Sequence, residues 1–252
     1  MEPQELDLTD LDGPAWVRLE GGTFRMGSER GSADTRPVHE VRVSSFRISC
    51  YPVTNAQYAE FVRATGRAAP KHWPDGDAPA DREIHPVTGV SWHDAHAFCA
   101  WLSERVAVGT EGAHLPTEAQ WEFAARGAER REYPWGGERP TPERTNYQES
   151  AIEDTSPVGS YPAGATPDGV HDLAGNVRQW CLDWYGEYDA EPQTDPAGPA
   201  AGEGRALRGG GYVDAPGTLR GSYRFTVDPD SSFGFVGFRV AWSSHGRPEA
   251  RR

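Results

Sequence analysis

The sequence predicts a loop-rich α+β domain in which short helices pack against an antiparallel sheet. Glycine and proline together contribute 50 of the 252 residues (29 Gly and 21 Pro). That content excludes a helical bundle and is typical of short elements joined by long, shaped loops. Short apolar runs near both ends of the chain indicate strands, and three runs with helical spacing lie between them. Nine Trp, nine Tyr and nine Phe provide large apolar side chains for a core.

Three helices are predicted from the way they begin. In each, a hydroxyl residue is followed three positions later by Gln or Asp, the pattern of a capping box that satisfies free backbone N–H groups. The pairs are Thr54 and Gln57, Ser91 and Asp94, and Thr117 and Gln120. Gly66 and Gly127 are positioned to end the first and third helix. Because each helix spans only about three turns, it needs packing against another element for stability.

Strands are predicted at both ends of the chain from short, partly alternating runs bounded by Gly, Pro and Ser. They cover residues 16–19, 24–26, 41–43, 46–48, 206–208, 212–213 and 238–242. This distribution favours one antiparallel sheet that joins the two ends. We expect a single domain over residues 16–243, with an acidic tail at 1–15 and a second tail at 244–252. The segment 186–204, rich in Pro, Ala, Gly and Glu, is predicted to be a surface loop.

The charge and the cysteine content restrict the partners and the compartment. The formal net charge is −13, and a uniformly acidic surface repels nucleic acid and anionic membranes but suits a cation or a basic peptide. No apolar run is long enough to span a bilayer. The first residues are acidic, without the basic start and apolar stretch of a secretory signal, which predicts a cytoplasmic protein. Cys50, Cys99 and Cys181 are widely spaced and fit reduced thiols.

Eight short blocks carry a resemblance to a known family. They are FRMGS (24–28), YPVTNAQYAEFV (51–62), HPVTGVSWHDAHAFCAWLS (85–103), LPTEAQWEFAARG (115–127), YPWG (133–136), GNVRQW (175–180), RGGGY (208–212) and GFRVA (237–241). In this order they resemble the signature blocks of the formylglycine-generating enzymes, or sulfatase-modifying factors. The matching domain of ergothioneine sulfoxide synthases and the pyoverdine-maturation proteins share these blocks. The resemblance implies a C-type-lectin-like α+β fold with little regular secondary structure.

The same resemblance identifies the place where copper would be bound. In copper-dependent members, one cysteine lies two residues beyond the aromatic residue of the RGGGY block, and a second lies five residues further on. Two thiolates suit copper(I), which is a soft ion. Asp214 and Leu219 occupy these positions here. A carboxylate is a hard ligand and leucine has no ligand atom, so we expect neither copper binding nor formylglycine formation by the copper route.

Other charged residues give no support for an iron site. Ergothioneine synthases hold iron on histidines of a separate helical domain, for which this chain has no counterpart. His93 and His96 are one helical turn apart, but neither residue belongs to the family pattern, and we interpret them as an exposed helix face. Arg208 and Arg239 belong to blocks that occur even in members that look inactive, and we expect them to tie loops together through bidentate hydrogen bonds.

The resemblance implies calcium at two turns. In the block HDLAGNVRQW (171–180) the matching ligands are the side chains of Asp172 and Gln179 and the carbonyls of Gly175 and Val177. Such a mixture of oxygens is usual for calcium, although the family has Glu at position 179. The alternative is an ion-free turn that leads into the core at Trp180 and Trp184. A weaker second site involves Asn146, the Tyr147 carbonyl and Asp154.

Four residues would line the cleft that corresponds to the family's active site: Arg178, Asp214, Arg220 and Tyr223. A cleft with a carboxylate, guanidinium groups and aromatic rings suits a zwitterionic small molecule or a peptide; the alternative is a solvated, salt-bridged surface. Two functions are compatible with these residues. The chain is either a ligand- or peptide-binding accessory module built on this fold, or an oxygen-dependent oxidoreductase that uses a metal site without cysteine. The missing thiolates favour the module.

Overall fold

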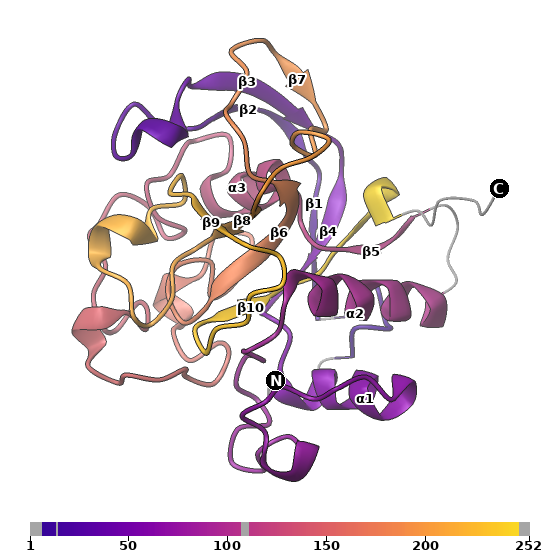
Figure 1. Cartoon of the computed structure of the whole chain (residues 1–252). Helices are drawn as coiled ribbons and strands as arrows, with labels where there is room; N and C mark the ends of the chain where they lie inside the picture. The colour runs from indigo at the N-terminus through magenta and orange to yellow at the C-terminus, as the bar shows by residue number, and fades with distance from the viewer. Residues whose placement is uncertain (1–6, 14, 107–110, 247–252) are drawn as a thin grey trace, which may run out of the picture.

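The computed structural model describes residues 7–13, 15–106 and 111–246, and within them it confirms an α+β fold with few, short regular elements (Figure 1). The α-helices are α1 (Asn55–Thr65), α2 (Trp92–Arg105) and α3 (Glu118–Arg126). The strands are β1 (Trp16–Leu19), β2 (Gly22–Met26), β3 (His39–Val43), β4 (Phe46–Ser49), β5 (Gly112–His114), β6 (Arg178–Trp184), β7 (Gln193–Thr194), β8 (Arg205–Arg208), β9 (Phe225–Val227), β10 (Val236–Phe238) and β11 (Ala241–Ser243).

All three predicted capping boxes are present, with both reciprocal hydrogen bonds formed in each. In α1, the Gln57 backbone N–H donates to Thr54 Oγ1, and the Thr54 N–H donates to Gln57 Oε1 at 2.9 Å. Gly66 ends this helix with a φ of 68°, in the left-handed region that glycine adopts without strain. The local sequence therefore determines where the helices begin and end.

The predicted antiparallel sheet is confirmed, in the strand order β1-β4-β11-β5. Trp16 pairs with Ser49, and Ala241 pairs with Ile48 on one side and His114 on the other. The sheet thus joins the two ends of the chain. Two further sheets were not predicted, with the orders β10-β6-β8-β9 and β2-β3-β7, and each contains one parallel pair, β10 with β6 and β3 with β7.

Two of the strand predictions were wrong. Residues 212–213 form a turn, not a strand, because the chain reverses after the glycines of the RGGGY block. The run 238–242 is divided between β10 and β11, since Arg239 turns inward between them. The predicted tails are partly structured: Leu8 is buried and accepts a hydrogen bond from Trp16 Nε1 at 3.2 Å, and residues 244–246 form a 3-10 turn. Residues 1–6 and 247–252 lie outside the described residues.

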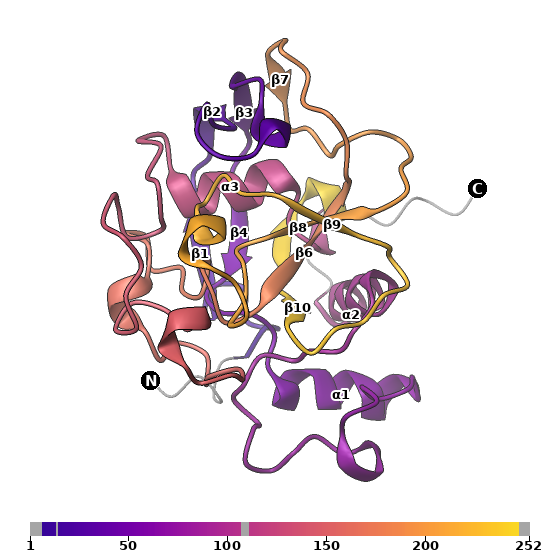
Figure 2. The ribbon, with the colours of Figure 1, turned by 60° about the vertical axis from the view of Figure 1, so that its left-hand side comes forward.

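The arrangement of the elements positions the candidate sites. Helices α1 and α2 lie beside each other, whereas α3 lies beneath the β2–β3 hairpin (Figures 1 and 2). The segment 186–204, predicted as a surface loop, crosses to this hairpin, where β7 pairs with β3. Among the described residues, no helix combines the length and apolar character needed to cross a membrane.

Candidate functional site

The first pair of predicted site residues, Arg178 and Asp214, is held together. Arg178 Nε lies 2.8 Å from Asp214 Oδ2, and Arg178 Nη2 lies 2.6 Å from Oδ1. Asp214 Oδ2 also accepts the Gly211 N–H at 2.7 Å. The Arg178 guanidinium lies 4.0 Å from the centroid of the Phe225 ring and 5.1 Å from that of Phe235. Both carboxylate oxygens are therefore already engaged within the chain.

Leu219, at the second thiolate position, is a core residue. It is fully buried and packs with Tyr133, Tyr147 and Ala174. The three cysteines lie elsewhere, all buried and free. Burial raises the pKa of the Cys50 and Cys181 thiols, which disfavours the thiolate form that binds copper(I). The two positions that carry copper ligands in the resembling enzymes therefore carry an ion-paired carboxylate and an apolar side chain.

The other two predicted cleft residues do not join this pair at one ligand site. Arg220 Nε donates to Glu132 Oε1 at 2.8 Å, and both side chains line a separate cavity of about 370 Å³. Tyr223 lies against Phe225, with 4.8 Å between the ring centroids. The two arginines thus form ion pairs with different partners, and a single cleft lined by all four residues stays a prediction.

A cavity of about 530 Å³ adjoins the RGGGY block; we call it the Tyr212 cavity. Its lining includes Tyr212, Lys71, Arg82 and Asn55. Asn55 is buried; its Nδ2 donates to the Arg82 carbonyl at 2.8 Å, whereas its Oδ1 has no hydrogen-bond partner in the described part of the chain. An unsatisfied buried acceptor is costly, so this oxygen favours a ligand that offers an N–H group.

Exposed apolar side chains lie next to this cavity in the sequence. Val213 follows Tyr212 and is 43% exposed, and Phe233, 39% exposed, lies between the cavity residues Ser232 and Gly234. Phe233 stacks on Phe235 with 5.3 Å between the ring centroids. Large exposed apolar side chains beside a cavity are typical of a binding surface.

Arg208 and Arg239 are structural, as predicted, and both are fully buried. Arg208 pairs with Glu122, and its Nη1 lies 3.3 Å from Glu118 Oε1. Arg239 Nε donates to Gln179 Oε1 at 2.7 Å, and its other nitrogens donate to backbone carbonyls, including Ser49 O at 2.8 Å. Burial lowers the pKa of Arg239 to about 10, so the group stays charged at neutral pH.

Known proteins share the sequence and the fold of this chain. The profile of the Sulfatase-modifying factor enzyme 1-like domain matches residues 4–244. The chain belongs to this family. The formylglycine-generating enzyme of Streptomyces coelicolor is 37% identical over 289 residues, which cover 89% of this chain and 88% of that protein. The structure of PvdO from Pseudomonas aeruginosa superposes with a TM-score of 0.80 at 26% identity, over 96% of this chain and 99% of that one.

A third relative is longer than this chain. The serine/threonine-protein kinase pkn1 of Chlamydia caviae is 36% identical over 245 residues, which cover 89% of this chain but only 37% of that protein. The chain thus spans little more than a third of that relative. The family domain is what the two proteins share.

The calcium that the family implies fits the first predicted turn only in part. Asp172 and Asn176 adopt left-handed φ values of 53° and 64°, and Asp172 Oδ2 accepts the Gly159 N–H at 2.8 Å. Gln179 Oε1, however, accepts hydrogen bonds from Trp121 and Arg239, and its Nε2 donates to the Asp172 carbonyl at 2.6 Å. Gln179 therefore does not fit as an ion ligand in this arrangement, and the Gly175 carbonyl accepts the Val177 N–H.

The second predicted calcium turn has one feature in favour of an ion and one against it. Asn146 is buried, and its Oδ1 has no hydrogen-bond partner among the described residues, as expected of an oxygen that coordinates a cation. Its Nδ2 donates to the Asp154 carbonyl at 2.7 Å. The Asp154 carboxylate pairs with Arg82 at 2.6 Å, and the Tyr147 carbonyl accepts the Ser150 N–H. Calcium at either turn stays a prediction.

The remaining candidates lie apart from these turns. His93 is exposed and 3.5 Å from Asp230, and His96 stacks on Trp92. In the described ranges, no group of three or more His, Cys, Asp or Glu side chains is placed to hold a metal. Sequence reasoning missed Asn55 and the buried carboxylate Asp183. Asp183 lies within the apolar run 180–185, which was a signal of burial, whereas the sequence around Asn55 gave none.

Proposed function

We propose that this chain is a ligand-binding member of the sulfatase-modifying factor family that does not perform copper-thiolate chemistry. The observation that carries the proposal is the pair Asp214 and Leu219 at the two thiolate positions. One is ion-paired with Arg178 and the other is buried in the core. Neither side chain provides the soft ligand that copper(I) prefers.

The Tyr212 cavity is the binding site in this proposal. Lys71 lines it and attracts a carboxylate. Arg82 lines it too, but it pairs with Asp154 of the same lining at 2.6 Å. The free Asn55 Oδ1 favours an N–H donor. The exposed Val213 and Phe233 would cover an apolar side chain. A peptide or a zwitterionic small molecule offers all three features. Nucleic acid and anionic membranes are poor partners for a chain with a net charge of −13.

The test of the chemistry is a sulfatase-derived cysteine peptide incubated with the protein, copper(I) and oxygen, followed by mass spectrometry. We expect no conversion of the thiol to an aldehyde. Multiple turnovers would contradict the proposal. Oxygen uptake with another substrate and an added metal would instead support an oxygen-dependent oxidoreductase with a metal site that lacks cysteine.

The test of binding compares a short peptide with a free carboxylate and its C-terminal amide, by calorimetry. Lys71→Met is expected to lower the affinity for the peptide with the free carboxylate and to leave the affinity for the amide unchanged, because only the carboxylate is negatively charged. Arg18→Met, a cation outside the cavity with a 62% exposed side chain, serves as the control. Equal affinities for both peptides in all three proteins would exclude the Tyr212 cavity as their site.

A further inference from the structure

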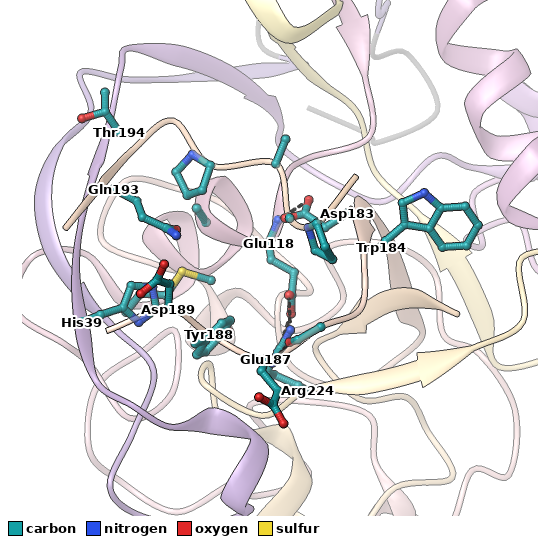
Figure 3. A pocket seen from close by; sticks show the side chains of 17 residues that line it. His39, Glu118, Asp183, Trp184, Glu187, Tyr188, Asp189, Gln193, Thr194 and Arg224 are labelled. Atoms are coloured by element: carbon teal, nitrogen blue, oxygen red, sulfur yellow. Dashed lines mark hydrogen bonds and ion pairs between the residues drawn. The ribbon is translucent and has the colours of Figure 1, made fainter. Parts of the chain in front are cut away.

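A second cavity, of about 570 Å³, lies on a different part of the molecule; we call it the Asp183 cavity. It is enclosed by the β2–β3 hairpin, the start of α3, the end of β6 and the segment 186–204. Figure 3 shows Glu118 and Asp183 side by side at one wall, with His39 and Asp189 across from them. The cavity shares no lining residue with the Tyr212 cavity, so a ligand bound in it is independent of the proposed function.

Asp183 is the buried acceptor of this cavity. The residue is 3% exposed, and its Oδ2 accepts the Glu118 N–H at 3.0 Å. No donor in the described part of the chain reaches Oδ1. Gly198, with a φ of 74°, lies so close that a Cβ there would approach the Asp183 Cβ to 2.9 Å. A carboxylate with one free oxygen inside a protein requires either a proton or a positively charged partner.

The arginine in the wall cannot be that partner, because it is fully used. Arg224 Nε and Nη2 donate to the two oxygens of Glu118 at 3.0 and 2.6 Å. Its Nη1 donates to the carbonyls of Asp34 and Gly186, both at 2.9 Å. Every guanidinium nitrogen is engaged, so Arg224 offers no donor to an anionic ligand.

The rest of the lining favours a cation with an apolar part. Glu187 and Asp189 are exposed carboxylates at the cavity. With Glu118 and Asp183 they give four acidic side chains in the lining, against the single arginine Arg224. Met26, Ala119 and several residues of the 196–199 run provide apolar surface. A negatively charged cavity with low-dielectric walls concentrates positive ligands.

We propose that the Asp183 cavity binds an organic cation that carries N–H donors, an ammonium or guanidinium group on a short apolar stem, with Asp183 as its buried counter-ion. The free amine of a small metabolite and the side chain of a basic peptide share this chemistry. The cation donates a hydrogen bond to Asp183 Oδ1, and its stem contacts the apolar wall.

The titration of Asp183 gives the proposal a distinct signature. Burial and the neighbouring Glu118 carboxylate raise the pKa of Asp183 to about 8, against the opposing influence of Arg224 and Arg208. Arg205 on β8 is a further cation that interacts with this carboxylate. At pH 7 the acid is therefore largely protonated, and a bound cation must displace that proton. Binding is expected to release a proton to the buffer at pH 7 and to release none at pH 9.5, where Asp183 is already ionised.

The experiment is calorimetric titration of the full chain with n-butylammonium and methylguanidinium chloride. The comparators are n-butanol, which has no charge, and tetramethylammonium, which has no N–H. We expect saturable binding of at least one N–H cation, and roughly ten- to a hundred-fold weaker binding of both comparators, the usual effect of a charged hydrogen bond. Heats measured at pH 7 in phosphate and in MOPS should differ, because the released proton protonates the buffer and the two buffers have different enthalpies of protonation.

Variants separate the buried carboxylate from the general acidity of the protein. Asp183→Asn keeps the size and the acceptor for the Glu118 N–H, and should weaken cation binding by roughly ten- to a hundred-fold and abolish the buffer dependence. Asp12→Asn, at an aspartate with a 90% exposed side chain, should change neither. Should Asp183→Asn fail to fold, proton release in the wild type still decides the question.

Four results would overturn the proposal. They are no saturable binding of either cation, equal binding of n-butanol, unchanged binding in Asp183→Asn, and identical heats in the two buffers at pH 7. Calcium chloride is titrated in parallel. If calcium binds and Asp183→Asn prevents it, the cavity holds a metal ion and not an organic cation. A separate titration compares a peptide that contains one Arg or Lys with its Ala counterpart. Stronger binding of the basic peptide than of the small cations would identify a side chain, and not a free amine, as the ligand.

Discussion

Arg178 and Asp214 form a two-point ion pair, and the guanidinium lies between the rings of Phe225 and Phe235. Sequence reasoning placed both residues in an open cleft. The structure instead gives the carboxylate a structural partner and a backbone donor, Gly211. The place where copper-dependent members present a reactive thiolate is here a closed, charge-compensated contact.

Asp214→Ala is expected to destabilise the protein by about 3 kcal/mol, because it leaves a largely buried guanidinium without its counter-ion. Urea denaturation measures the change. Arg178→Ala together with Asp214→Ala should restore part of the loss, since no unpaired charge remains. A change below about 0.5 kcal/mol, typical of exposed positions, would show that the pair is not formed in solution.

Gln179→Glu restores the carboxylate that the family carries at this position. With a chelator present, the variant is expected to be less stable than the wild type by about 1–3 kcal/mol. The Gln179 Nε2 group that donates to the Asp172 carbonyl is replaced by a carboxylate oxygen, which repels that carbonyl. Added calcium should restore the stability by binding between these oxygens. A variant that is insensitive to calcium would mean that Arg239 alone compensates the new charge.

Chelation of the wild type tests calcium itself. If calcium binds only the folded state, a hundred-fold excess over the dissociation constant raises stability by about 2.7 kcal/mol, so a chelator should lower the Tm. Asp172→Ala and Asn146→Ala report on the two turns separately, and each should remove the sensitivity only if its own turn holds the ion. A Tm that does not respond to chelator in any of the three proteins would refute calcium at both turns.

Glu122→Gln tests the buried ion cluster around α3 through its pH dependence. Burial alone would raise the pKa of Glu122, but Arg208 and Arg126 lower it below its ordinary 4.5. A lowered folded-state pKa means that the stabilisation is complete above about pH 5 and is lost as the pH falls through the folded-state value. The stability difference between wild type and variant should therefore shrink below pH 4.5.

The expected difference at pH 7 is about 3 kcal/mol, the effect of breaking a buried pair. Glu129→Gln is the matched control, because Glu129 also pairs with an arginine but has a 71% exposed side chain. It should cost well under 1 kcal/mol at any pH. A Glu122→Gln deficit that stays constant between pH 3 and pH 7 would place the loss in packing and not in charge.

The parts of the fold that depend on neighbouring residues could be predicted from the sequence. Each helix start was encoded within four residues, as Thr54 and Gln57 show, and the strands at both ends showed alternation. Strand β6 was missed because its burial does not alternate: Trp180 and Cys181 are both fully buried. Parallel pairing was missed because nothing local encodes it.

The sites were harder to predict, because they depend on partners far apart in the chain. Asp183, Glu118 and Arg224 come together only in the folded structure, and a lone carboxylate in a sequence suggests a solvated surface. The sequence placed Asp214 where the resemblance implies a cysteine, but it did not show the ion pair with Arg178. The sequence showed only that Leu219 has no ligand atom, and the structure shows that it is buried against Tyr133, Tyr147 and Ala174.

The position of β11 has a consequence for the synthesis of the protein. Residues 241–243 lie between β4 and β5, so the sheet that begins at Trp16 is incomplete until Ser243 has left the ribosome. Until then β4 and β5 each keep one edge without a partner, and such edges attract other nascent chains. The central sheet therefore closes only when synthesis has passed residue 243. Ribosome-bound chains that end before Ala241 should therefore remain sensitive to protease and associate with chaperones.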